Sequence, residues 1–136
     1  MQACYHRDAI FNDAAFRDLT STEVKAMWEM LLTSATDLRI EFRDVQSHGN
    51  MGSCHWEAWY TFSGTGRKVH NIINASFEFR DGKIYRHNDS FNFWRWSKQA
   101  LGTPGFLLGW APMLQSKVRN TSKQRLQKFM EKSRLK

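Results

Sequence analysis

Three strand-like segments joined by very short turns limit the folds open to this chain. Residues 53–62 (SCHWEAWYTF) and 68–79 (KVHNIINASFEF) are separated by only five residues, and the turn Arg80-Asp81-Gly82-Lys83 leads into a third segment that runs to about residue 95. Asp-Gly is a typical hairpin-turn sequence. Strands connected this closely pair antiparallel, so we expect a meander, and residues 38–45 (LRIEFRDV) are predicted to add a fourth strand to it.

Side chains alternate in direction along a strand, so each predicted strand has an inner, apolar face and an outer face. The inner face is predicted to carry Trp56, Tyr60, Asn71 and Phe91. The outer face is predicted to carry Trp59, Ile72 and Trp94. Large exposed apolar patches usually mark contacts. The outer face is therefore either an interface between two copies or a surface covered by the C-terminal segment.

One amphipathic helix precedes the strands. Thr20 followed three residues later by Glu23 is a capping box, which marks a helix start. The apolar residues that follow recur with helical spacing, namely Val24, Met27, Trp28, Leu31 and Leu32. We therefore predict a helix over residues 20–34 that covers the inner face of the sheet, which gives an α+β fold.

Composition narrows the function classes. The 136 residues are enough for one core, and their six Trp, ten Phe and three Tyr favour a core or cavity lined by flat side chains. The five histidines are scattered, and neither metal-type spacing nor a Gly-rich phosphate loop occurs, so we predict no metal and no cofactor. Cys4 and Cys54, without a signal-peptide pattern, indicate reduced thiols in a cytoplasmic protein.

Charge divides the chain in two. Residues 1–96 carry 11 basic and 12 acidic side chains, whereas residues 97–136 carry 9 basic residues and the single acid Glu131. We therefore predict a near-neutral domain over residues 1–96 and a basic extension over 97–136. Within this extension we predict an apolar loop containing Gly and Pro at 101–112 and a helix that starts at Pro112.

The basic helix has two interpretations. Its cations are suited to nucleic acid or an anionic membrane surface. Its thin apolar stripe, which includes Leu126, Phe129 and Met130, instead indicates a solvated helix packed on the domain. The segment lacks a series of base-stacking aromatic residues, so we favour the second interpretation and predict no specific nucleic-acid partner. No run of 18 apolar residues occurs in the chain, so no membrane span is predicted.

The stretch HNDSF within the third segment places His87 and Asp89 on the same face as Tyr85, Phe91 and Phe93. An unpaired charge on an apolar face is costly, so this ionisable pair is either a buried structural hydrogen bond or part of a pocket. We favour the pocket.

Two patterns, joined by the capped helix, resemble the SnoaL-like branch of the nuclear transport factor 2 superfamily. They are C-Y-H-x-D-A-x-F-x-D at 4–13 and F-R-D-G-K-I-x-x-H-x-D-x-F-x-F-W-R-W at 79–96. The resemblance implies a cone, in which a strongly curved antiparallel sheet wraps helices around a deep apolar pocket. It also implies a homodimer through the outer sheet face. Relatives usually begin with a long helix that closes the cone, and here that helix is expected to be missing or truncated.

The resemblance also implies site residues. Asp13 falls where ketosteroid isomerase has its general base, and His87 with Asp89 matches a cyclase-like H-x-D pattern. Ala75 stands where the isomerase has its second acid, and the Arg-x-Asp pair of limonene epoxide hydrolase has no counterpart. We therefore predict Asp13, His87 and Asp89 as catalytic residues. The predicted ligand-binding residues are Trp28, Trp56, Tyr60, Asn71 and Phe91.

The predicted function is binding of a small apolar or cyclic molecule, with cofactor-free acid–base chemistry of the isomerase, cyclase or hydrolase kind. The alternative is a non-catalytic module for ligand binding or dimerisation.

Overall fold

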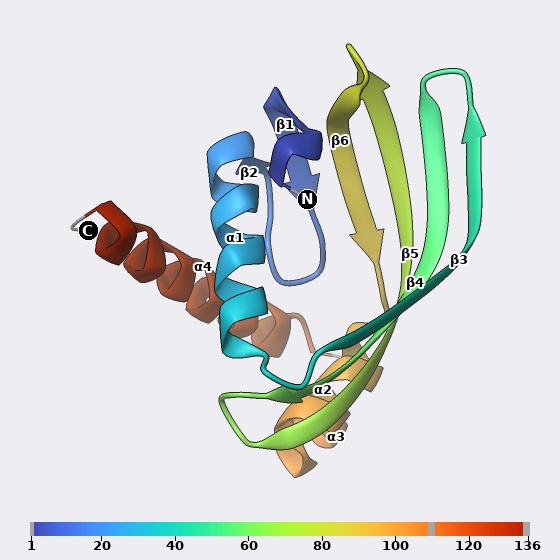
Figure 1. Ribbon diagram of the computed structural model, residues 1–136. Helices are drawn as coiled ribbons and strands as arrows, with labels where there is room; N and C mark the ends of the chain where they lie inside the picture. The colour runs from blue at the N-terminus through green and yellow to red at the C-terminus, as the bar shows by residue number, and fades with distance from the viewer. Residues whose placement is uncertain (1, 109–110, 135–136) are drawn as a thin grey trace.

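A single curved sheet of six strands is the centre of the fold (Figure 1). The computed structural model describes residues 2–108 and 111–134. Its strands, in the spatial order β2-β1-β6-β5-β4-β3, are β1 (Tyr5–Asn12), β2 (Leu19–Thr20), β3 (Arg39–His48), β4 (Met51–Phe62), β5 (Arg67–Arg80) and β6 (Lys83–Ser90). The helices are a short 3₁₀ turn η1 (Gln2–Cys4), α1 (Ser21–Ser34), α2 (Phe93–Leu101), α3 (Thr103–Leu108) and α4 (Pro112–Arg134). The predicted α+β cone is confirmed.

The strands β3, β4 and β5 match the predicted strands to within three residues and pair antiparallel. Trp56 pairs with Ile73, and Trp59 pairs with His70. The Trp28 ring of α1 lies 6.2 Å from the Trp56 ring, between centroids. The predicted register is therefore confirmed, with Trp56 on the helix side and Trp59 on the other.

The predicted meander from β3 to β6 is antiparallel throughout, but the complete sheet is mixed. The N-terminal segment, for which the sequence predicted no strand, forms β1 and pairs parallel to β6. Tyr5 is opposite Ile84 and Phe11 is opposite His87. This pairing joins residues about eighty positions apart in the sequence, and a local turn motif cannot indicate a contact over such a separation.

Helix α1 covers the inner face of the sheet beside β1 (Figure 1). The capping box is present: Glu23 N–H donates to Thr20 Oγ1 at 3.3 Å, and Thr20 N–H donates to Glu23 Oε1 at 3.1 Å. Val24, Met27 and Met30 are buried in the same cluster as Phe11. The predicted helix is confirmed.

The third strand of the meander is shorter than predicted. β6 ends at Ser90, and Asn92 caps α2 by accepting a hydrogen bond from Arg95 N–H at 3.0 Å. Helical spacing then buries one face of α2, formed by Phe93, Trp96, Ser97 and Ala100. Trp94 and Phe93 therefore belong to a helix, and the assignment of Trp94 to the outer sheet face is wrong.

Tyr85 also differs from the prediction. The register between β5 and β6 shifts between Glu78 and Phe79, as expected of a β-bulge. Ile84 consequently packs against the main core, while the Tyr85 ring contacts His6 and stacks with the guanidinium of Arg80. His87 and Asp89 beyond the bulge remain buried.

The predicted loop at 101–112 contains a helix, because residues 103–108 form α3 against α2. Gly105 allows this close packing, since a Cβ there would meet the backbone carbonyl of Ser97. Gly109 and Trp110 of the predicted loop lie outside the described residues. None of the helices described is both long and apolar enough to cross a membrane.

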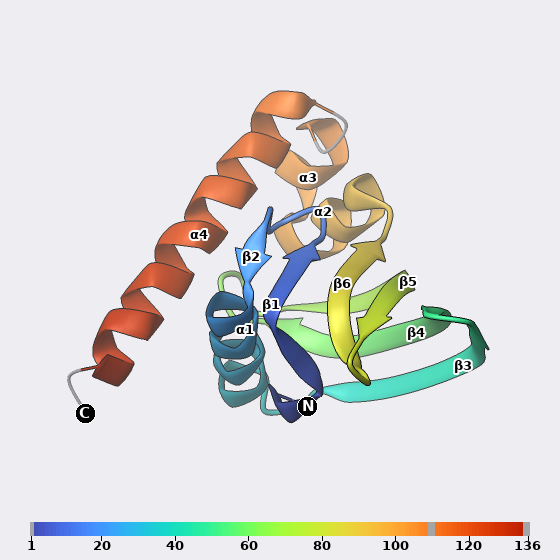
Figure 2. The same ribbon diagram turned by 90° about the horizontal axis from the view of Figure 1, so that it is seen from above.

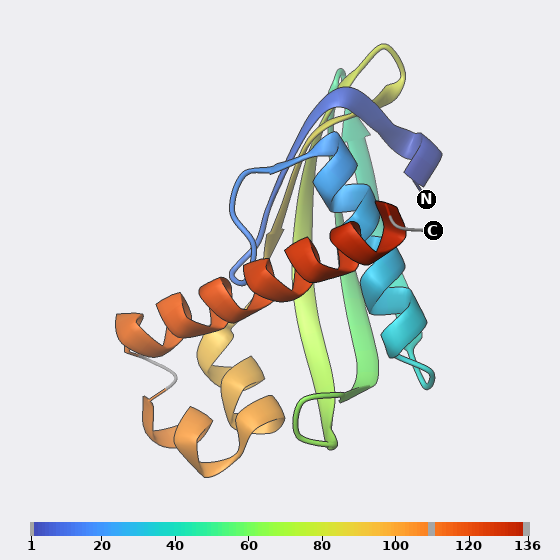
Figure 3. The same ribbon diagram turned by 90° about the vertical axis from the view of Figure 1, so that its left-hand side faces the viewer.

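Helix α4 crosses α1 rather than the outer face of the sheet (Figure 3). Viewed from above, it runs along the side of the molecule that carries α1 and β2 (Figure 2). Leu126 is buried in the main core, where Phe129 and Met130 also pack. The apolar stripe predicted for this helix is confirmed, and α4 does not cover Trp59.

Candidate functional site

A cavity of about 780 Å³ lies between the inner face of the sheet, α1, α2 and α4. Seven of the eight predicted site residues line it, namely Asp13, Trp28, Trp56, Tyr60, Asn71, Asp89 and Phe91. The eighth, His87, is buried behind the cavity wall and contacts Asp89, which lines the cavity. The structure therefore brings together the residues that the sequence singled out.

Asp13 lies at the end of β1, where the chain turns toward β2. Its Oδ1 accepts hydrogen bonds from the backbone N–H groups of Ala15 and Phe16, both at 2.7 Å. Among the described residues, Oδ2 accepts no hydrogen bond. Burial raises the pKa of Asp13 to about 6, and the negative charge of Asp89 adds to the rise, while the two backbone donors oppose it.

His87 and Asp89 form one end of a buried chain of hydrogen bonds. Trp28 Nε1–H donates to the Tyr5 hydroxyl at 2.9 Å, and that hydroxyl lies 2.8 Å from His87 Nδ1. His87 Nε2 in turn lies 2.8 Å from Asp89 Oδ1. The indole only donates, so the Tyr5 oxygen accepts from it. The Asp89 carboxylate only accepts, so Nε2 is the protonated nitrogen of a neutral His87 ring, and Nδ1 accepts the Tyr5 hydrogen. His87 therefore carries its proton on Nε2 and donates it to Asp89.

Aromatic rings hold this chain in place. The His87 ring lies 4.8 Å from the Phe11 ring and 4.5 Å from the Phe77 ring, between centroids. Both His87 and Asp89 are less than a tenth exposed. The two predicted alternatives for the pair are thus combined, because it is a buried hydrogen bond whose carboxylate end lines the cavity.

A second tyrosine adds a hydroxyl to the cavity. Trp96 Nε1–H of α2 donates to the Tyr60 hydroxyl at 2.9 Å. Burial raises the pKa of Tyr60 and the charge of Asp13 raises it further, while the hydrogen bond from Trp96 lowers it, so the hydroxyl stays protonated. The Tyr60 oxygen accepts the hydrogen bond from Trp96, so the hydroxyl hydrogen of Tyr60 remains free to be donated to another acceptor. The sequence predicted Tyr60 as a ligand-binding residue but assigned no role to its hydroxyl.

Four polar residues of α4 also line the cavity, and the sequence analysis missed them. They are Lys117, Thr121, Ser122 and Arg125. Arg119 fixes the helix to the loop that carries Asp13, since its Nε–H donates to the Ala14 carbonyl at 3.0 Å. The available signal was the spacing of four between Lys117, Thr121 and Arg125, which places all three on one helix face.

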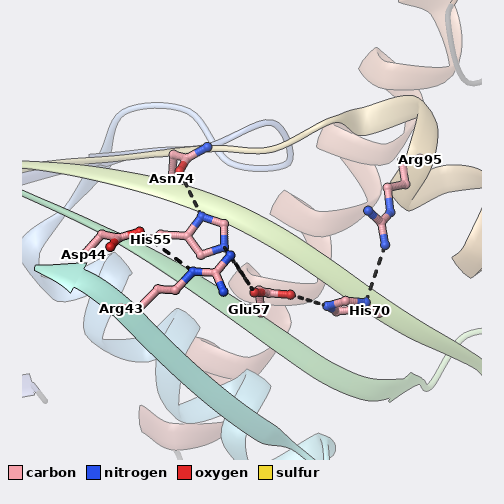
Figure 4. Close-up of polar contacts among 7 residues, drawn as sticks. All are labelled: Arg43, Asp44, His55, Glu57, His70, Asn74 and Arg95. Atoms are coloured by element: carbon pink, nitrogen blue, oxygen red, sulfur yellow. Dashed lines mark hydrogen bonds and ion pairs between the residues drawn. The ribbon is translucent and has the colours of Figure 1, made fainter.

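The outer face of the sheet carries a separate polar cluster (Figure 4). Glu57 accepts from His70 at 2.6 Å and from His55 at 3.1 Å, through different carboxylate oxygens. These hydrogen bonds lower the pKa of Glu57. Within the described part of the chain, no group of three or more His, Cys, Asp or Glu side chains has an arrangement suited to a metal ion.

The sequence profile of the SnoaL-like domain matches residues 1–87. The chain belongs to the SnoaL-like family. A search of curated proteins finds no match.

Solved structures with the same fold include three proteins of low sequence identity. IdmH, a putative polyketide cyclase from Streptomyces antibioticus, has a TM-score of 0.60 and 18% identity, covering 74% of this chain and 84% of its own. An LEH-like epoxide hydrolase from M. tuberculosis has a TM-score of 0.60 and 14% identity, covering 78% of this chain and 77% of its own. TerC, crystallised with polyporic acid, has a TM-score of 0.53 and 18% identity, covering 65% of this chain and 74% of its own.

Proposed function

We propose that this SnoaL-like protein binds a small cyclic ketone in its cavity and catalyses proton transfer at the carbon next to the carbonyl, without a cofactor. The observation that carries this proposal is the state of Asp13. Its carboxylate lines an aromatic cavity, is fixed through Oδ1 by two backbone N–H groups, and has a pKa of about 6. A base with a pKa near neutrality takes up and returns protons efficiently.

In the proposed step, Asp13 Oδ2 removes a proton from the carbon, and the electrons of the C–H bond move to the carbonyl oxygen to form an enolate. The Tyr60 hydroxyl donates a hydrogen bond to this oxygen, since Trp96 already occupies Tyr60 as a donor. Where a C=C bond is conjugated with the enolate, return of the proton from Asp13 to the far carbon of this system completes an isomerisation. In a cyclisation the enolate carbon instead bonds to a second carbonyl carbon, the electrons of that C=O bond move to its oxygen, and the proton held by Asp13 passes to this oxygen.

Asp89 and His87 act in this proposal as positioning residues. The Asp89 charge helps to raise the pKa of Asp13. His87 donates to Asp89 Oδ1 and is itself oriented by Tyr5, so Asp89 is held in one position at the cavity wall. The polyketide cyclase and the epoxide hydrolase with the same fold support chemistry in such a cavity, and the polyporic acid of TerC supports binding of a cyclic molecule.

The test is exchange of the acidic C–H protons of 2-tetralone for deuterium, followed by proton NMR in D₂O at pH 7. We expect the protein to accelerate exchange, and the Asp13→Asn variant to lower the rate by ~10² or more. Asp18→Asn is the matched control, because Asp18 is an exposed residue of the same β1–β2 connection. Binding of 2-tetralone without any acceleration contradicts catalysis and leaves the non-catalytic binding module.

We also propose a homodimer through the outer face of the sheet around Trp59 and Ile72. The Trp59 ring is half-buried between His70, stacked at 4.5 Å between centroids, and the guanidinium of Arg39 at 4.2 Å from the ring centroid. Light scattering at micromolar concentration should give twice the chain mass, and Trp59→Glu should reduce it to one. A monomeric wild-type protein contradicts this proposal. The cytoplasmic location inferred from the cysteines stays a prediction.

A further inference from the structure

The polar face of α4 gives the cavity a charge that the proposed proton transfer does not use. Lys117 and Arg125 line the cavity from this helix, together with the hydroxyls of Thr121 and Ser122. Residues four apart lie on the same face of a helix, so Lys117, Thr121 and Arg125 form one row. Two cations with hydroxyls between them are donors suited to an anion.

Neither cation is neutralised by a residue that the structure describes. Among the described residues, no carboxylate lies within ion-pair distance of Lys117 or Arg125. The whole C-terminal segment from residue 97 contains only one acid, Glu131, against nine basic residues. Lys117 and Arg125 are therefore available to bind an anionic group of a ligand.

The opposite charge lies elsewhere in the same cavity. Asp13, which directly follows β1, and Asp89 of β6 both line it, and the Asp89 charge contributes to the raised pKa of Asp13. A carboxylate on the ligand is attracted by the α4 cations and repelled by the two aspartates. These opposing charges favour a single orientation of an acidic ligand.

The cation row is held at a fixed place. Leu126, next to Arg125, is 1% exposed in the main core. Arg119, next to Val118 of the cavity wall, is bonded to the Ala14 carbonyl at 3.0 Å. The helix that carries the cations is thus anchored on both α1 and the residue that follows Asp13.

We infer that the cavity takes a cyclic ligand that bears a carboxylate, and that Lys117 and Arg125 of α4 bind this group while the ring lies among the aromatic residues near Asp13. The inference rests on the proposed ligand binding in the cavity and adds the class of ligand. It makes α4 the element that selects an acidic substrate over a neutral one.

The experiment compares 2-naphthoic acid with 2-naphthamide by isothermal titration calorimetry at pH 7.5. The two probes share a ring system and differ in charge. We expect the acid to bind about tenfold more tightly than the amide at low salt, as for a charge-assisted hydrogen bond, and this preference to shrink as salt is added. The Lys117→Gln/Arg125→Gln variant should bind both probes equally, and its thermal unfolding should match that of the wild type because both residues are exposed.

The matched control is Lys123→Gln/Lys128→Gln. It removes the same charge from the same helix at exposed positions that do not line the cavity, so it should keep the preference for the acid. Equal binding of the two probes by the wild type overturns the inference, as does an equal loss in the control variant. If neither probe binds while 2-tetralone exchange is catalysed, the inference is wrong and the proposed function stands. If neither probe binds and exchange is not catalysed, both are wrong.

Discussion

His87 Nε2 lies 2.8 Å from Asp89 Oδ1, and both side chains are buried where Asp89 lines the cavity. The opposite nitrogen of the same ring lies 2.8 Å from the Tyr5 hydroxyl, which accepts from Trp28. A helix, the first strand and the last strand are thus connected by one directional chain of hydrogen bonds. A chain of this kind fixes the position of the carboxylate more firmly than a single pair, because each hydrogen bond orients the side chain that forms the next one.

The Tyr5→Phe variant tests the middle of this chain. It removes the hydroxyl and leaves both Trp28 Nε1–H and His87 Nδ1 without their partner, so we expect a loss of about 1–3 kcal/mol in the free energy of unfolding. Urea denaturation measures the loss. Tyr85→Phe is the control, since the Tyr85 hydroxyl has no hydrogen bond among the described residues, and it should change stability by less than about 0.5 kcal/mol. Equal losses in the two variants contradict a role for the chain.

The tautomer of His87 gives a second, independent check. Because the Tyr5 hydroxyl donates to Nδ1, the ring proton belongs on Nε2. Nitrogen-15 chemical shifts of labelled histidine at pH 8 should show His87 with a protonated Nε2 and an unprotonated Nδ1. In Tyr5→Phe this preference should weaken. A proton on Nδ1 in the wild type contradicts the direction assigned to the chain.

Asp13 makes stability depend on pH in a predictable direction. Its pKa is about 6 in the folded protein and about 3.9 in an unfolded chain, so the folded state holds the proton more tightly between these values. Stability is then lost as the pH rises through this window. Asp13→Asn keeps an oxygen acceptor for Ala15 and Phe16 but cannot ionise. It should be more stable than the wild type at pH 8, by about 1–3 kcal/mol, and equal to it at pH 3.

Denaturant unfolding at both pH values measures this difference. Asp18→Asn, at an exposed position, should show no such pH-dependent gain. An Asp13→Asn variant that is less stable than the wild type at pH 8 indicates instead that the ionised carboxylate holds the loop together.

Local signals predicted most of the fold. The capping box of Thr20 and Glu23 located α1, and the alternation of side chains along β4 placed Trp56 toward α1. The predicted end of β6 was wrong because the sequence of Asn92 and the aromatic residues after it is equally compatible with a strand. In the structure this segment is a helix, because Asn92 caps it by accepting from Arg95 N–H and because Phe93 and Trp96 are buried at helical spacing.

The missed parts depend on contacts between distant segments. No pattern in residues 5–12 indicates that β1 pairs with β6, which lies about eighty residues later. The site shows the same division. Asp13, Asp89 and the aromatic lining followed from the strand faces and the family resemblance. Lys117 and Arg125 belong to a helix whose packing direction across α1 is set by Leu126 and Arg119, and a basic helix alone does not reveal which of its faces meets a cavity.

Glu57 provides a test of the outer face of the sheet, independent of the cavity. Hydrogen bonds from His70 and then His55 lower its pKa, so the carboxylate contributes stability above its unfolded pKa, and this contribution is lost as the pH falls through the lower folded value. Glu57→Gln should therefore lower the urea midpoint at pH 6.5, and its curve should approach that of the wild type near pH 3. Glu41→Gln is the matched control, because Glu41 is opposite Glu57 on β3 and exposed. Removing one of two like charges that face each other across strands should leave stability unchanged or raise it slightly. If Glu41→Gln is as destabilising as Glu57→Gln at pH 6.5, the loss reflects the net charge of this face rather than the two histidine contacts.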